Sequence, residues 1–510
     1  MLSSKRKLRL TSVFSLSLQL LTIVYGFILP RLFLGFYGSA VNGLVSSITQ
    51  FLGFIALAEC GIGAVVQSAF YKALSQRDNV GLSKIIVSAE HFFRNIAKLL
   101  LAYTIVLVFI FPKIINGNFD FLYTGSLIAI IAISSFAQYY FGITYRLLLN
   151  SDQFGFVPYA VQIVALLLNL PLSIALMYGG ASVHVVKLVS SIVFLIQPLS
   201  ISFIAHRWYK INRKVEVDKN AIPQKWNGLA QHISAVVLQS SGITVLTFFS
   251  TLENVSVYAI YFLVVNGVRN LTMAVTNGVQ AFLGNLFAKG DVKTFEINFE
   301  SFEFRMHFFV TLVFSITAVL VVPFVGVYTK GVTDVNYITP AFGILLTAGW
   351  GMYCLRLPYN IVVLAVGHYR QTQNSAIIEA VLNLVTGCIL LFCYGLVGVA
   401  IGTLIAMVYR TSYLAWYISK NVLHRSLWIF VKHLFVDAIA IISFMAIIYV
   451  LGEPFTKACS SNYVEWVVSA VKASLIGILV VTIVNAVFFH HEISRLINRK
   501  KLKNCNPPGK

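Results

Sequence analysis

Residues 52–66 read LGFIALAECGIGAVV, and a glutamate, Glu59, stands in the middle of this apolar stretch. The apolar run around it is long enough to cross a lipid bilayer, which takes about 20 helical residues. A carboxylate at that depth costs free energy, so we expect it to face other protein groups or a water-filled space. The stretch therefore predicts a helix of a membrane protein that has a polar interior.

The composition of the whole chain agrees with this prediction. The 510 residues are 58% hydrophobic and only 11% charged, and the mean hydropathy is +0.82. A soluble globular protein carries about 25% charged residues, so this chain has too little polar surface to cover a water-soluble globule. Because helices satisfy their own backbone groups in lipid, the expected class is an all-α polytopic membrane protein.

Fourteen candidate spans are found when a length of about 20 residues is applied along the chain. They lie near 13–36, 41–70, 97–116, 121–148, 158–179, 182–205, 228–251, 254–281, 306–328, 337–366, 373–394, 397–419, 430–451 and 464–489. The basic start MLSSKRKLRL leads into an apolar run that is too long for a signal-peptide core, so no cleavable signal peptide is expected.

The basic residues predict the orientation. The net charge is +20, and most Lys and Arg lie in short segments that share one side if the N-terminus is cytoplasmic, above all 206–227 and 495–503. The positive-inside rule then places both termini in the cytoplasm. A nucleic-acid partner is not expected, because no basic stripe with interleaved aromatic residues occurs. The six cysteines form no C-x-x-C pair, so neither disulfides nor a metal site is expected.

A faint internal repeat divides the chain. The segment VQSAFYKALSQRD at 66–78 aligns with VQAFLGNLFAKGD at 279–291 at an offset of 213, and the Tyr-Gly pair at 178–179 aligns with that at 394–395 at an offset of 216. Internal repeats of this kind are typical of transporters. We therefore predict two pseudo-symmetric six-helix lobes and a C-terminal pair of helices: 1–225 with a basic cytoplasmic linker, 226–425, and 426–510 with a basic tail.

Charged residues inside the predicted spans are the main functional signal. They are Arg31, Glu59, Arg269, Arg356, Glu379 and Arg410. Each would cost roughly 2.5–3.5 kcal/mol at the centre of a lipid-facing helix, so we expect them to line a wet cavity or to pair with one another. Four arginines against two glutamates predict a cationic cavity. Guanidinium groups suit the bidentate binding of phosphate or pyrophosphate.

Glu59 and Arg269 occupy similar positions in the two halves of the repeat. They precede the matched residues Gln67 and Gln280 by eight and eleven residues, so they lie within about one helical turn of the same depth. This predicts an ion pair across a cleft between the lobes, which could act as a gate; a static pair that only fixes packing is the alternative.

The other four charges are open to more than one interpretation. Arg31 follows Pro30, which would kink the helix towards a cavity, although an arginine reaching for the outer interface is an equal alternative. Arg356 lies near Pro358, and a cavity position is favoured there. Glu379 and Arg410 are weaker candidates, because they are expected near the cytoplasmic end, where snorkelling or a local pair explains them.

Catalytic motifs are absent from the sequence. It contains no Walker A loop, no H-E-x-x-H and no D-x-D, so an ATPase, a zinc hydrolase and a glycosyltransferase are disfavoured. A non-enzyme is expected.

Several stretches carry a family resemblance: PRLFLGFYG (30–38), NGLVSSITQFL (42–52), AECGIGAVVQSAFYKAL (58–74), AVGHYRQTQNSAIIEAVLN (365–383) and YGLVGVAIGTLIA (394–406). With them the chain resembles the multidrug/oligosaccharidyl-lipid/polysaccharide exporter (MOP) superfamily. More narrowly, it is similar to the polysaccharide transporters, the Wzx-type flippases of O-antigen or capsule repeat units.

The resemblance implies alternating access around a cationic cavity in the bacterial cytoplasmic (inner) membrane. The implied cargo is an undecaprenyl-pyrophosphate-linked oligosaccharide of polysaccharide or lipopolysaccharide biosynthesis. It implies that Arg31 and Arg269 serve the pyrophosphate, and that an acidic residue is common where Glu59 stands. Membrane lipids, a polysaccharide polymerase and glycosyltransferases are the implied partners. No cofactor is implied beyond a coupling ion, a proton or sodium.

Three alternatives remain open from the sequence. One is a cation-coupled multidrug antiporter of the same superfamily, which the cationic balance of the intramembrane charges disfavours. A membrane polysaccharide polymerase or glycosyltransferase is the second, although no large outer loop or acidic catalytic cluster is found. The third is a scaffold without transport, which leaves the intramembrane charges unexplained.

Overall fold

The computed structural model describes residues 3–59, 62–76, 78–115, 119–216, 229–276, 279–451 and 462–490. Every regular element within them is helical, and twelve helices are long and apolar enough to cross a membrane. The prediction of an all-α multi-pass membrane protein is therefore confirmed. The predicted number of fourteen spans stays a prediction, because residues 6–59 count as one continuous stretch and 340–366 is divided into two shorter helices.

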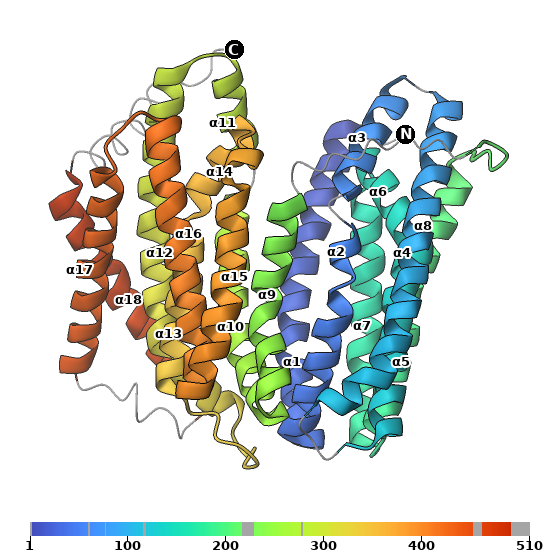
Figure 1. Ribbon diagram of the computed structural model, residues 1–510, viewed down its shortest axis with the longest axis horizontal. Helices are drawn as coiled ribbons and strands as arrows, with labels where there is room; N and C mark the ends of the chain where they lie inside the picture. The colour runs from blue at the N-terminus through green and yellow to red at the C-terminus, as the bar shows by residue number, and fades with distance from the viewer. Residues whose placement is uncertain are drawn as a thin grey trace. The chain divides into compact units, whose positions relative to one another are not determined.

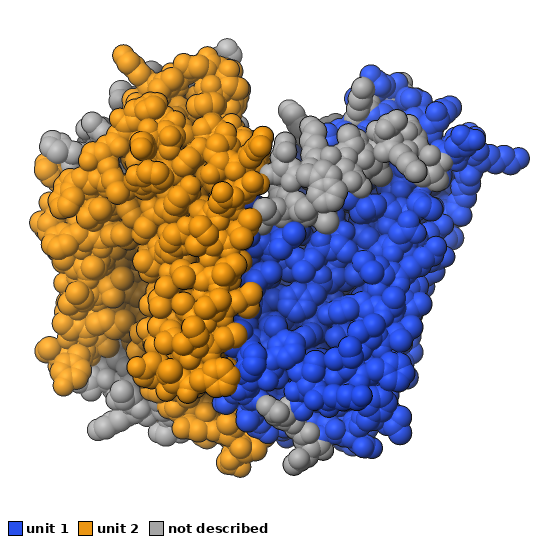
Figure 2. Space-filling view, in the orientation of Figure 1, with its two compact units in different colours: residues 1–259 blue, residues 260–510 orange. Residues whose placement is uncertain are grey.

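Two compact units make up the chain, Met1–Ala259 (unit 1) and Ile260–Lys510 (unit 2), coloured blue and orange in Figure 2. The predicted lobe boundary at 225/226 falls in 217–228, outside the described residues. The helices of unit 1 are α1 (Ser4–Gly53), α2 (Ala56–Glu59), α3 (Ile62–Gln76), α4 (Asn79–Ile114), α5 (Phe121–Ala137), a π-helical turn (Gln138–Gly142), α6 (Ile143–Ser151), α7 (Phe156–Tyr178), α8 (Val183–Trp208) and α9 (Leu229–Phe249).

Helix α10 (Leu252–Val275) begins in unit 1 and ends in unit 2. The remaining helices belong to unit 2: α11 (Val279–Ala288), α12 (Val292–Tyr328), α13 (Pro340–Leu355), α14 (Leu357–Val366), α15 (Tyr369–Tyr394), α16 (Leu396–Asn421), α17 (Trp428–Val450) and α18 (Tyr463–Phe488). Figure 1 labels these elements.

Helix α1 turns back on itself at Gly38, whose backbone has φ 81° and ψ 175°. This positive φ favours glycine, which has no Cβ. Leu29 and Gln50 line the same 310 Å³ cavity, although 21 residues of straight helix would hold them about 30 Å apart. The two halves of α1 are thus antiparallel and correspond to the predicted spans 13–36 and 41–70. Within the second predicted span, residues 54–55 form a turn between α1 and α2. Residues 60 and 61 lie outside the described residues, so the continuity of this span stays a prediction.

Small and polar side chains join α1 to the last helices of unit 1. A Cβ on Gly43 would lie 1.8 Å from the carbonyl oxygen of Leu252, so only glycine permits this approach. One helical turn further, the hydroxyl groups of Ser47 and Thr247 lie 2.8 Å apart and share a hydrogen bond. Close packing through small residues is how helices associate in lipid, where apolar burial gives no advantage.

In unit 2, α17 and α18 pack beside the long helix α12 (Figure 1). Their contact is an apolar cluster that includes Leu320 of α12, Phe444 of α17 and Val480 of α18. The indole of Trp466 also donates to the carbonyl of Leu320 at 3.3 Å. The C-terminal helix pair is therefore anchored on the first long helix of unit 2.

Each unit holds a buried glutamate in the same way. In unit 1, the hydroxyl of Tyr145 donates to Glu90, and a guanidinium nitrogen of Arg213 lies 3.7 Å from the same carboxylate oxygen. We call these three residues the unit 1 triad. Glu90 lies on α4, whose N-cap Asp78 was one end of the repeat seen in the sequence.

The unit 2 triad consists of Glu303, Tyr359 and Arg425. The hydroxyl of Tyr359 and a guanidinium nitrogen of Arg425 both donate to Oε1 of Glu303. Arg425 follows α16; burial opposes its charge, but the hydrogen bond and the charge of Glu303, with other nearby groups, outweigh burial and raise the pKa of Arg425. The offsets from the unit 1 triad are 213, 214 and 212 residues, which agree with the offset of the sequence repeat.

Candidate functional site

Arg356 occupies the break between α13 and α14. It ends one helix and starts the next, with φ −78° and ψ −18°. Pro358, in the first turn of α14, has no N–H to donate, and the first turn is where a helix tolerates that loss. The sequence LRLPYN therefore explains locally why the chain breaks here and presents a guanidinium group at the junction.

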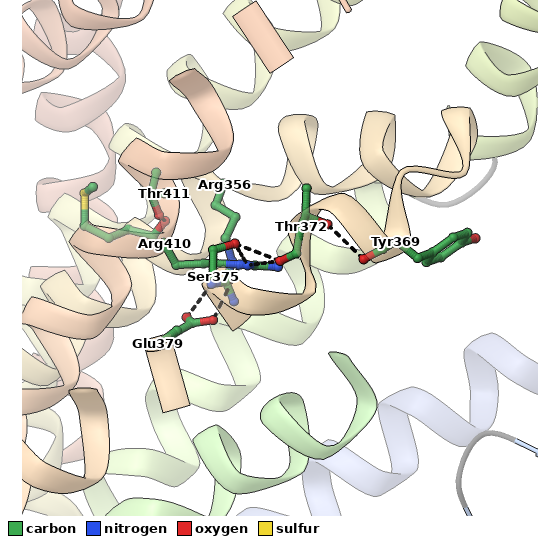
Figure 3. A network of polar contacts seen from close by, with 8 residues as sticks. Arg356, Tyr369, Thr372, Ser375, Glu379, Arg410 and Thr411 are labelled. Atoms are coloured by element: carbon green, nitrogen blue, oxygen red, sulfur yellow. Dashed lines mark hydrogen bonds and ion pairs between the residues drawn. The ribbon is translucent and has the colours of Figure 1, made fainter. Parts of the chain in front are cut away.

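Two arginines converge on one carboxylate at this break, as Figure 3 shows. Arg356 donates to Oε1 of Glu379 on α15, and Nε of Arg410 on α16 lies 3.8 Å from Oε2 of the same glutamate. Arg410 also donates to the carbonyl of Thr372 at 2.9 Å and to the hydroxyl of Ser375. Three helices are thus tied together by a network in which both oxygens of the carboxylate face a cation.

The burial of this network distinguishes the two alternatives left open for Glu379 and Arg410. Glu379 is 4% exposed and Arg410 is 3% exposed, so neither side chain snorkels to an interface; the alternative of a local pair describes them. Arg356, for which a cavity position was favoured, contacts Glu379 directly, so the three charges form one cluster. Breaking a buried pair by removing one partner costs about 3–5 kcal/mol, because an uncompensated charge is left behind.

Arg269 of α10 lies near the same break but has no carboxylate partner among the described residues. Its guanidinium carbon lies 4.9 Å from the ring centre of Trp350 and 5.8 Å from that of Tyr353. The guanidinium carbon of Arg356 also lies 4.3 Å from the ring centre of Tyr353. The ring of Tyr353 therefore lies within cation–π distance of two guanidinium groups.

The hydrogen bonds of Arg269 are incomplete. Only Nη2 has a recorded partner, the side-chain oxygen of Asn270 at 3.1 Å. Nε and Nη1 of Arg269 and Nε1 of Trp350 are buried and have no hydrogen-bond partner among the described residues. Buried donors are almost always satisfied in proteins. Three donor nitrogens without a partner among the described residues, beside a buried positive charge, are what an anion would satisfy.

The predicted residues of unit 1 are placed separately. Glu59 lies in α2 and is partly buried; a Cβ built on Gly63 would lie 3.2 Å from its Oε1. Arg31 is partly buried in the first half of α1, one turn before Gly35. The predicted ion pair between Glu59 and Arg269 joins two units that are described individually, so it stays a prediction.

Two aromatic residues of the site were missed in the sequence. Trp350 and Tyr353 precede Arg356 by six and three residues, which places all three on one helical face. A spacing of three between aromatic and arginine side chains in an apolar helix was the available signal. It was hidden by the high aromatic content of the whole chain, 14%.

The fold is similar to that of several solved transporter structures. The structure of the lipid II flippase MurJ in an inward closed conformation superposes with a TM-score of 0.70 at 17% identity, covering 95% of this chain and 99% of that one. A MOP superfamily transporter from Pyrococcus furiosus gives 0.51 at 15% identity, with 83% and 97% covered. A multidrug resistance MATE family transporter in an outward-facing conformation gives 0.50 at 15% identity, with 81% and 95% covered.

These identities are low, so the likeness concerns the fold. No protein-family model and no curated protein sequence matches the chain. All three structures are described as transporters or flippases, and this chain has the multi-pass architecture that they share.

Proposed function

We propose that this protein is a flippase that moves an undecaprenyl-pyrophosphate-linked oligosaccharide from the cytoplasmic to the outer leaflet by alternating access. In a bacterium its place would be the cytoplasmic (inner) membrane, within polysaccharide biosynthesis. The fold likeness to a lipid II flippase supports the lipid-linked class of cargo. The Wzx-like resemblance of the sequence favours a repeat unit of O-antigen or capsule as the glycan.

The observation that carries this proposal is the state of Arg269. A buried guanidinium with two donor nitrogens that lack a partner among the described residues, beside the indole Nε1 of Trp350 in the same condition, is suited to bind an anion. Charge-assisted hydrogen bonds to phosphate oxygens are stronger than neutral ones. The site contains three arginines and one glutamate, so an anionic group neutralises it whereas a cationic one adds repulsion.

Glu379 has a supporting role in this proposal. Both of its oxygens face arginines, so it holds Arg356 and Arg410 in place and offers no free carboxylate to a cationic cargo. Arg356 in turn lies over Tyr353, the ring that Arg269 also approaches. The network thus orients the aromatic wall beside the proposed pyrophosphate position.

The test is transport of a pyrophosphate-linked oligosaccharide in proteoliposomes by the wild type, by Arg269→Ala and by Arg370→Ala. Arg370 is exposed at the start of α15 and serves as the matched control. Losing the charged hydrogen bonds, worth about 1.5–3 kcal/mol, should slow transport by Arg269→Ala roughly 10- to 100-fold. A folded wild type that moves no such lipid contradicts the function. Equal rates for wild type and Arg269→Ala contradict the site.

Export of cationic drugs is the second candidate, since a MATE family transporter shares the fold. The cationic site disfavours it, because a positively charged drug would meet three arginines and one occupied carboxylate. Ethidium uptake into the same proteoliposomes separates the two functions.

A further inference from the structure

Helices α12 and α17 meet at a buried ionisable pair that has no part in the proposed anion site. Nδ1 of His307 lies 2.6 Å from Oδ2 of Asp437, and the hydroxyl of Thr311 donates to Oδ1 of Asp437 at 2.7 Å. His307 is 1% exposed, and Asp437 is also buried. Ionisable groups at membrane depth are costly and need a reason.

A second imidazole covers the first. The rings of His307 and His433 are stacked, with centres 4.7 Å apart and planes at 23°. Phe489 stacks on His433 in turn, at 4.6 Å and 14°. Two positive charges at this separation would repel each other in a buried setting, so the stack accommodates one imidazolium at most.

The hydrogen bonds show where a proton can be added. An ionised carboxylate only accepts hydrogen bonds, so Nδ1 of His307 carries the hydrogen that lies between the two residues. The other ring nitrogen, Nε2, then has a free lone pair, and it is buried without a partner among the described residues. A proton added at Nε2 converts the neutral ring to an imidazolium and leaves the bond to Asp437 intact.

The surrounding charges favour this addition. The ionisable groups packed around the pair are Glu303 of α12, Tyr359 of α14, Arg425 before α17, and Lys432 and His433 of α17. Glu303 and Arg425 neutralise each other. The ammonium of Lys432 is partly exposed and lies over Phe489 at 4.7 Å. Asp437 is therefore the uncompensated buried charge, and an imidazolium at His307 compensates it.

The corresponding place in unit 1 has different chemistry. At the offset of 213 residues, Arg94 replaces His307, and it binds back to Glu90 at 3.2 Å. A guanidinium stays charged at any physiological pH, whereas an imidazole gains and loses a proton near neutrality. Asp437 is supplied by α17 of the C-terminal helix pair, which has no counterpart among the described helices of unit 1. The ionisable pair is thus an addition to one half of the repeat.

We propose that His307 and Asp437 form a proton-binding site in unit 2, with Nε2 of His307 as the atom that takes the proton. Protonation turns a charged α12–α17 contact into a neutral ion pair, so the packing of these two helices depends on proton occupancy. The use of this proton to drive transport rests on the proposed flippase function. The binding of the proton does not.

Proton binding is measured on the purified full chain by ¹⁵N NMR of labelled histidines between pH 5 and 9. The resonances of His307 are assigned as those that are missing from the spectrum of His307→Gln. In the wild type they should change, as the pH falls, from those of a neutral ring with hydrogen on Nδ1 to those of an imidazolium. The same resonances should be present in the control His91→Gln, which alters an exposed histidine of α4. A His307 ring that keeps one protonation state over this range overturns the proposal.

A second variant keeps the test decisive if His307→Gln does not fold. Asp437→Asn preserves the shape of the side chain but removes its charge, so it should displace the midpoint of the His307 titration. An unchanged midpoint overturns the assignment of Asp437 as the partner. Neither measurement involves a substrate, so both stand if the cargo proposed above is wrong.

Coupling is measured in proteoliposomes as the ratio of transport rates with and without a pH gradient. The wild type and His91→Gln should both be accelerated by the gradient, whereas His307→Gln should give a ratio of one. A wild type that ignores the gradient, or a His307→Gln variant that still responds to it, overturns the coupling. Absence of transport of this lipid in all three proteins, with the NMR titration intact, counts against the proposed cargo and not against the proton site.

Discussion

The unit 1 triad and the unit 2 triad combine the same three residue types in opposite surroundings. Arg213 of unit 1 has a side chain that is 56% exposed, whereas that of Arg425 in unit 2 is 10% exposed. In unit 1, Arg94 and His206 join the group, and Nε2 of His206 lies 2.6 Å from Arg213. The unit 1 triad is thus a partly hydrated cluster rich in cations, and the unit 2 triad is a dry one.

This difference shows that similar contacts in the two halves of a repeat can contribute different free energies to stability. A carboxylate–guanidinium pair in contact with water gains little, because solvent already stabilises both charges. The same pair in a dry setting is costly to form and much more costly to break. Equivalent substitutions in the two triads therefore compare the same kinds of residues in an exposed and in a buried environment.

The largest difference is expected for removal of the glutamate charge. Glu303→Gln leaves Arg425 buried and unpaired, so it should destabilise the protein by about 3–5 kcal/mol. Glu90→Gln should cost about 1 kcal/mol, because water can solvate the exposed guanidinium of Arg213. Thermal unfolding in detergent, followed by size-exclusion chromatography, measures both variants. Equal losses would show that the two surroundings do not differ in the way their exposure indicates.

A smaller difference is expected for the tyrosine hydroxyls. Tyr359→Phe removes a donor from a fully buried carboxylate and should cost about 1–3 kcal/mol, whereas Tyr145→Phe should cost about 1 kcal/mol. The same unfolding measurement applies, and each phenylalanine variant preserves ring packing. A larger loss in unit 1 would mean that His206, which lies 3.1 Å from the hydroxyl of Tyr145, depends on that hydroxyl.

The smallest effect is expected for the exposed arginine of unit 1. Arg213→Ala should reduce stability by about 0.2–1 kcal/mol, and the loss should diminish when the salt concentration is raised from 0.05 to about 0.5 M, because ions screen exposed charges. Arg425→Ala is the matched variant, and its larger loss should be nearly independent of salt. Salt dependence in unit 2 instead would place Arg425 in contact with solvent.

The sequence identified candidate functional residues where a charged side chain lies within an apolar run. Arg269, Arg356, Glu379 and Arg410 stood out because each interrupts an apolar run, and the structure brings the last three into contact. Asp437 also interrupts an apolar run, HLFVDAIAII in the predicted span 430–451, but it was not recognised as a candidate.

The remaining features depend on distances that a sequence does not contain. His307 and Asp437 are 130 residues apart, and only the packing of α17 on α12 brings them together. The helix breaks show the same limit on a smaller scale. The sharp turn at Gly38 lay between two predicted spans, but the turn at 54–55 between α1 and α2 lay inside one, because the single glycine before it, Gly53, does not end a helix by composition alone.

The turn at Gly38 has a consequence for where the chain tolerates insertions. Because one residue reverses the chain, the two halves of α1 follow each other without a loop between them. We expect an epitope or glycosylation tag inserted at position 38 to disturb the packing of the two halves, because the reversal depends on the positive φ of this glycine.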